Sequence, residues 1–142
     1  MYRTLIAAAL AMAVGAGLQL CAVASAADQP ASEAADYTAH CANCHGDKLQ
    51  GGVHAAPLSG PVFEQNWAGK RARLLYSRII STMPQNDPGT LTAQQALSIT
   101  LYVLARNGIG FAGHSITSPN DLNTLTIAHG ASSSTPASNS PR

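Results

Sequence analysis

The sequence has 142 residues, of which 46% are hydrophobic and only 5% aromatic, and its eight basic residues nearly balance seven acidic ones. A chain of this length is expected to form one domain. The near-zero net charge argues against nucleic acid as a partner, because nucleic-acid-binding domains usually carry a marked excess of basic residues.

The first segment, residues 1–27, has the features of a secretory signal peptide. Arg3 supplies a positive charge, an apolar run follows from Leu5 to Leu18, and Ala24-Ser25-Ala26 matches a small-x-small cleavage site. An uncleaved membrane anchor is the alternative, although Gln19 interrupts a run that is already short for a membrane span. We therefore expect an exported, periplasmic protein with no membrane span after signal cleavage.

A domain is expected over residues 28–118, and its first helical pattern covers about residues 32–44. Ala34, Tyr37, Cys41 and Cys44 follow one another at spacings of three, four and three residues, so one helical face would carry all of them.

The second pattern, about residues 69–82, is an amphipathic helix. Pro84 disfavours the α region for Met83, so this helix must end at or before Met83. Its polar side is expected to carry the basic residues Lys70, Arg71, Arg73 and Arg78.

The third pattern runs from Ala93 to Arg106. Thr92 and Gln95 form a capping-box sequence at its start, and Gly108 is a stop signal after its end. Because no stretch alternates with period two, we expect an all-α fold of three main short helices joined by long loops. Residues 119–142 are expected to be an extension, rich in Ser, Thr and Pro and disordered at its end.

The motif that carries chemistry is Cys41-Ala42-Asn43-Cys44-His45. C-x-x-C-H is the attachment signature of c-type haem. Both thiols form thioethers with the haem vinyl groups, and His45 becomes the proximal iron ligand. A covalently bound haem would also supply the apolar core that so small and loop-rich a domain needs.

Two other kinds of site use the same residue types. A thioredoxin-like redox pair requires a βαβ framework, which the helical pattern does not offer. A zinc site requires further ligands at short spacing, whereas the other histidines, His40, His54, His114 and His129, are scattered singly.

Met83 is the candidate for the second axial ligand of the iron. The other two methionines, Met1 and Met12, lie in the expected signal peptide, so Met83 alone could supply a thioether. Pro84 releases it from the helix into an extended loop. The alternative is an ordinary gap-filling core methionine.

The sequence from Tyr37 to Gly110 resembles a class I, monohaem periplasmic cytochrome c, of the kind that serves bacterial periplasmic dehydrogenases. The resemblance rests on the segments 37–46, 56–60, 83–84, 87–92 and 101–108.

That resemblance implies two further roles. The carbonyl of Pro57 is expected to accept a hydrogen bond from the Nδ1–H group of His45, which would fix the ring's orientation. Trp67 is expected to pack near the haem edge, or else to be a structural core residue. The resemblance also places Tyr102 where the first helix crosses the last.

The predicted function is one-electron transfer by a single haem c, without catalysis, because His45 and Met83 together leave the iron no open position. Redox proteins are the expected partners: a dehydrogenase donor, a terminal oxidase acceptor, or both. The alternatives are a haem subunit of a larger dehydrogenase or oxidase, and a haem enzyme or sensor with a labile Met83 ligand.

Overall fold

The computed structural model describes residues 29–129, and the expected signal peptide and the end of the expected C-terminal extension lie outside them. Over the described residues the fold is all-α, with one isolated β-bridge and no strand, as predicted. No helix in this range is long and apolar enough to cross a membrane. The elements are α1 (Gln29–His40), α2 (Ala42–His45), α3 (Gly60–Trp67), α4 (Ala72–Thr82), α5 (Ala93–Arg106) and the 3-10 helix η1 (Asp121–Asn123).

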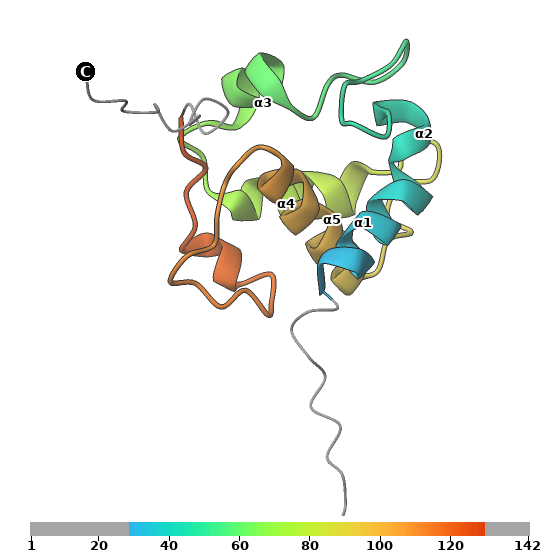
Figure 1. Cartoon of the computed structure of the whole chain (residues 1–142). Coiled ribbons are helices and arrows are strands. Elements are labelled where there is room, and N and C mark those ends of the chain that lie inside the picture. Colours follow the sequence, from blue (N-terminus) through green and yellow to red (C-terminus); the bar gives the residue numbers. More distant parts are fainter. Residues whose placement is uncertain (1–28, 130–142) are drawn as a thin grey trace, which may run out of the picture.

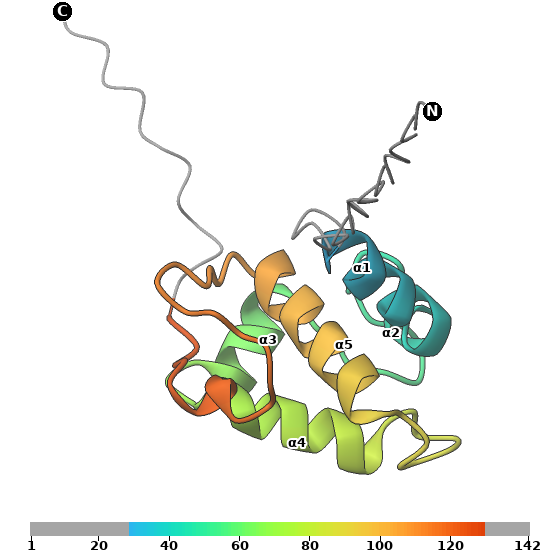
Figure 2. The same cartoon turned by 90° about the horizontal axis from the view of Figure 1, so that it is seen from below.

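Helix α5 occupies the centre of the molecule, with α1 packed on one side of it and α4 on the other (Figures 1 and 2). This position explains its composition, since α5 buries residues on most of its circumference. The predicted capping box is present: the Thr92 hydroxyl accepts from the backbone N–H of Gln95, and the Gln95 side chain accepts from the backbone N–H of Thr92.

The single first helix that we expected is divided at Cys41. That residue has φ −127° and ψ −35°, so α1 ends at His40 and α2 begins at Ala42. The break redirects the side chains that follow. Tyr37 is buried, Cys41 is half-buried and Cys44 is exposed, so the predicted common face does not continue through the motif.

Helix α4 ends at Thr82, as Pro84 predicted, and Met83 is its C-cap in an extended conformation. It is amphipathic, as expected, and its buried residues are Ala72, Leu75, Tyr76 and Ile79, but the polar side differs from the prediction. Lys70 and Arg71 precede the helix, because α4 begins only at Ala72.

Helix α3 was not predicted. Its signals are weak, since it has eight residues and buries only Phe63, although Pro61 in its first turn is a helix-start signal.

The packed core continues beyond Ser118, where the domain was expected to end. Backbone hydrogen bonds tie residues 125–127 to the start of α4: Ala72 N–H donates to the Leu125 carbonyl and Ile127 N–H to the Lys70 carbonyl, both at 2.9 Å. Leu122, Leu125 and Ile127 are buried, with Ile127 only 1% exposed. The sequence pattern missed this segment because its apolar residues lie in an irregular coil.

Candidate haem site

The motif is held on one short turn. The backbone N–H groups of Cys44 and His45 both donate to the Cys41 carbonyl, at 3.2 and 2.9 Å. No disulfide joins the two cysteines, and His45 is the last residue of α2. One turn therefore carries both cysteines and the histidine of the motif.

The ring of His45 has a defined tautomer. Its Nδ1 lies 2.8 Å from the Ala56 carbonyl oxygen. A carbonyl oxygen can only accept, so Nδ1 carries a proton, and in the neutral ring the lone pair is therefore on Nε2. That lone pair is what an iron ligand needs, and such a hydrogen bond orients a ligating ring.

The accepting carbonyl belongs to Ala56, so the expectation for Pro57 was wrong by one residue. The cause is the path of the loop. Gly52 N–H donates to the Ala55 carbonyl at 2.9 Å, which turns the chain back on itself just before Ala56. Leu58 N–H is already engaged with the Leu49 carbonyl at 2.8 Å, and Pro57 lies half-buried between these two anchors.

Residues 46–59, the loop from α2 to α3, pack closely against the motif. Gly51 N–H donates to the His45 carbonyl at 2.8 Å. A side chain at Gly52 would bring its Cβ within 2.7 Å of the Cys44 carbonyl oxygen, so only glycine fits. Leu49 is fully buried with a φ of 60°, a conformation that costs a non-glycine residue free energy and that burial and hydrogen bonds must offset.

Tyr37 connects α1 to the residue after the motif. Its hydroxyl donates to the Gly46 carbonyl at 2.7 Å, and its ring is 1% exposed. The ring centroid lies 4.8 Å from that of Tyr102, which confirms the expected position of Tyr102 at the α1–α5 crossing. Burial raises the pKa of Tyr37 above its ordinary range, so the hydroxyl remains a donor.

The loop that follows α4 lies on the same side of the molecule as α2 in both views (Figures 1 and 2), and Met83, the C-cap of α4, begins this loop. Met83 is half-buried. Trp67 ends α3 and packs, half-buried, against the core, with the Lys70 ammonium 5.5 Å from its ring centroid.

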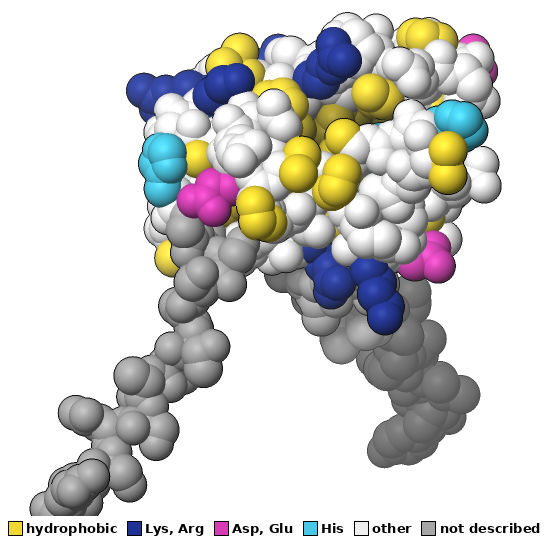
Figure 3. All heavy atoms as spheres, turned by 90° about the horizontal axis from the view of Figure 1, so that it is seen from above, with side chains coloured by type: hydrophobic (Ala, Val, Ile, Leu, Met, Phe, Trp, Pro, Cys, Tyr) yellow, Lys and Arg dark blue, Asp and Glu magenta, His cyan; other side chains and the backbone are white. Residues whose placement is uncertain are grey.

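Several large apolar side chains pack against the core without being buried by it, among them Leu58, Trp67 and Ile80. A bound cofactor could cover such surface. Figure 3 shows hydrophobic side chains gathered across the middle of the face that is uppermost in Figure 1, with Lys and Arg at its margins. Covering such surface on cofactor binding is favourable.

The Cys41 thiol differs from a redox-active cysteine. Burial, and secondly the neighbouring Cys44, raise its pKa to about 11, whereas redox-active cysteines have a lowered pKa. No three His, Cys, Asp or Glu side chains between residues 29 and 129 are grouped to hold a metal ion. His40 contacts Gln95, and His114 contacts Thr124.

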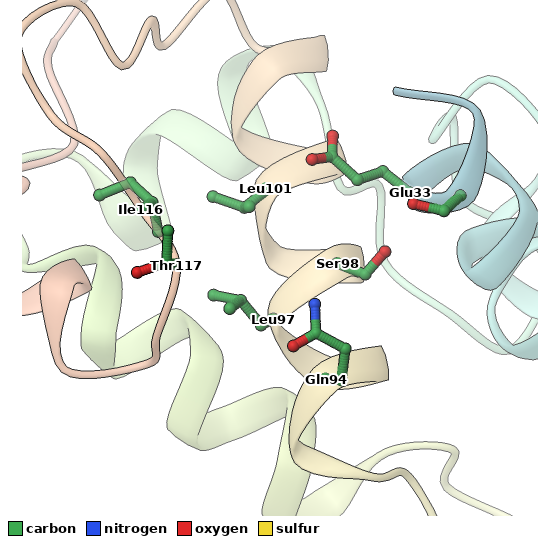
Figure 4. A pocket seen from close by; sticks show the side chains of 8 residues that line it. Glu33, Gln94, Leu97, Ser98, Leu101, Ile116 and Thr117 are labelled. Atoms are coloured by element: carbon green, nitrogen blue, oxygen red, sulfur yellow. The ribbon is translucent and has the colours of Figure 1, made fainter. Parts of the chain in front are cut away.

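A cavity of about 100 Å³ lies apart from the motif, between the start of α1, α5 and residues 116–117 (Figure 4). Its lining includes Glu33, whose pKa is raised by burial, and Ser98. None of the predicted site residues lines it, and its volume accommodates only a few waters.

The sequence pattern gave Asn107 no role of its own. In the structure it is 5% exposed and contacts the loop before α3: its Nδ2 donates to the Leu58 carbonyl at 2.8 Å, and its Oδ1 accepts from Gly60 N–H at 3.2 Å. An asparagine before glycine at a helix end is a common sequence, so nothing marked these contacts in advance.

Fold and site together define a small all-α c-type cytochrome. The chain belongs to the family described as "Cytochrome C oxidase, cbb3-type, subunit III", whose model matches residues 28–103. Membership of this cytochrome c family makes the chain an electron-transfer protein with covalently bound haem c.

One solved structure, the sulfane dehydrogenase SoxCD from Paracoccus pantotrophus, has a similar fold, with a TM-score of 0.54 at 19% sequence identity. The similarity covers 68% of this chain and 52% of that one, so the alignment spans about half of the SoxCD chain. No curated protein sequence matches the chain significantly.

Replacing Tyr37 by Phe should lower the unfolding free energy of the haem-loaded protein by about 1 kcal/mol near pH 7, because the Gly46 carbonyl loses its donor. The pKa of Tyr37 is higher in the folded than in the unfolded protein. The contribution of Tyr37 to the unfolding free energy is therefore complete below the pKa of an unfolded tyrosine, about 10, and is lost as the pH rises above that value. Denaturant unfolding at a series of pH values should show the gap between wild type and Tyr37→Phe closing above about pH 10.

The control is Tyr102→Phe, which keeps the ring contact and should change stability by less than about 0.5 kcal/mol. Parallel stability curves for wild type and Tyr37→Phe across the whole pH range would contradict the assignment.

Proposed function

We propose that this protein carries electrons one at a time on a single haem, attached through Cys41 and Cys44 and ligated by His45 and Met83. The observation that carries the proposal is the turn that holds both cysteines and His45, whose Nδ1 is bonded to the Ala56 carbonyl, so that Nε2 is the nitrogen left to ligate iron. Met83 is the proposed second ligand, because it is half-buried and extended at the end of α4, where a loop begins that lies on the same side of the molecule as α2.

When bound, the haem supplies a one-electron iron couple, and the chain determines what that couple can do. His45 and Met83 would together hold the haem iron, and with both side chains bound the iron would have no open position for substrate. A thioether ligand also raises the reduction potential relative to a second nitrogen ligand. Both properties suit a carrier that exchanges electrons by contact.

We further propose that residues 1–27 direct export and that the protein works in the periplasm between a dehydrogenase donor and a terminal oxidase acceptor. A second candidate is a haem subunit of a larger dehydrogenase or oxidase. The name of the family favours that candidate, since it describes a subunit of an oxidase. Both readings use the same chemistry and differ in whether the partner is permanent.

The side of the molecule that carries α4 is the proposed docking surface for an acidic partner. Lys70 and Arg78 are exposed, and Leu74 between them is 53% exposed, while α4 contains no acidic residue. The basic side chains of such a surface can increase the rate at which an acidic protein encounters it, and an exposed apolar side chain can then contact the bound partner. Arg71 and Arg73 are less available to contact a partner, because each has a contact within the protein. Arg71 donates to the Asn123 carbonyl, and the Arg73 guanidinium lies over the Tyr76 ring.

Met83→Ala should abolish the weak far-red sulfur-to-iron absorption of the ferric protein and lower its reduction potential, while the haem stays covalently attached. Met83→His, as the matched variant, should stay six-coordinate without that absorption. An unchanged ferric spectrum in Met83→Ala would assign the second ligand elsewhere, for example to one of the remaining histidines.

Arg78→Glu should slow electron exchange with an acidic redox protein by a factor of roughly 2–10 at low ionic strength, and the difference should disappear at high salt. Arg106→Glu, at the exposed end of α5, makes the same charge change away from α4 and serves as the control. Stopped-flow rates across a salt series measure both. Equal slowing by the two variants would point to net charge rather than a docking surface.

A further inference from the structure

Asn107 makes three side-chain hydrogen bonds although it follows the end of α5. Its Nδ2 donates to the carbonyls of Leu58 and Val103, each at 2.8 Å, and its Oδ1 accepts from Gly60 N–H at 3.2 Å. Only one of these bonds is needed to complete the helix end. The other two hold a loop that is distant in sequence.

The same loop is held from the other side by Leu49. The Leu49 carbonyl accepts from Leu58 N–H at 2.8 Å and from the Ser59 hydroxyl at 3.2 Å. Leu49 N–H in turn donates to the Gly46 carbonyl at 3.1 Å, next to the motif. Leu58 is therefore clamped between the end of the motif and the end of α5.

The clamped residues directly follow the carbonyl that orients His45. Ala56 is two residues before Leu58, and Pro57 between them restricts the backbone on both sides. A displacement of Leu58 would thus be transmitted to the Ala56 carbonyl.

We infer that Asn107 is a positioning residue for the iron ligand: by holding Leu58 and Gly60, it keeps the Ala56 carbonyl on Nδ1 of His45. The inference rests on the proposed function, in which His45 ligates the haem iron. It assigns to the end of α5 a role in ligand orientation, in addition to packing against α1 and α4.

An amide is the side chain that the position requires. Its two donors and one acceptor face two carbonyls and one N–H group, which can form their bonds only with that pattern. Asp at this position could accept from Gly60 but would place a carboxylate against two carbonyl oxygens. Leu would fill the space without any of the three bonds.

The test is hydrogen exchange of the His45 Nδ1–H group, followed by NMR in the reduced, haem-loaded protein. In Asn107→Leu and Asn107→Asp this proton should exchange at least about tenfold faster than in wild type, because the loop opens more often. The control is Leu97→Ala, which removes a buried side chain from the same helix, about 15 Å along the helix axis from Asn107. Its exchange at this proton should rise only by the amount that its global loss of stability predicts.

A wild-type measurement covers the case in which neither Asn107 variant folds. The His45 Nδ1–H, the Leu58 N–H and the Asn107 side-chain amide should then exchange through one opening, with the same dependence on denaturant. Exchange at His45 that is independent of Leu58, or variants that behave like Leu97→Ala, would overturn the inference. Failure of the proposed function would show differently: the wild-type protein would then carry no haem ligated by His45. A haem-loaded wild type whose His45 exchange is independent of Asn107 would overturn only the inference on Asn107.

Discussion

The hydrogen bond from His45 to the Ala56 carbonyl imposes the main constraint on this fold. It requires residues 46–59 to turn back on the motif, which in turn requires glycine where the backbone passes the Cys44 carbonyl. It also requires Leu49 to adopt a left-handed conformation inside the core. Tyr37 holds the end of the motif from the other side, through the Gly46 carbonyl. The surrounding elements therefore serve to keep one imidazole ring in place.

The helices provide a rigid frame for that ring but leave a conspicuous apolar surface. The core around α5 is well packed, and even residues 122–127 contribute to it. Leu58, Trp67, Ile80 and Met83 stay only half-buried. A domain this small can gain buried apolar area from a prosthetic group. A bound haem would cover these half-buried side chains and would also supply the redox chemistry. Electron transfer then follows from the family and from the chemistry of the motif.

The parts that could be predicted from sequence depend on local signals. The cap of α5 is defined by Thr92 and Gln95, the end of α4 by Pro84, and the motif by its spacing. The parts that could not be predicted depend on tertiary contacts. Cys41 interrupts a helix that its sequence would continue, and the loop path transfers the accepting carbonyl from Pro57 to Ala56. The burial of Ile127 and the bonds of Asn107 arise only when distant segments meet.

The central claim is that Cys41 and Cys44 bind one haem covalently beside His45. The most direct test is the intact mass of the protein, produced with haem-maturation machinery and measured after acid denaturation. We expect the mass of the chain plus one haem, and the mass of the chain alone for the Cys41→Ala/Cys44→Ala protein. A denatured wild-type protein that had lost its haem, or that carried a disulfide between the two cysteines, would contradict it.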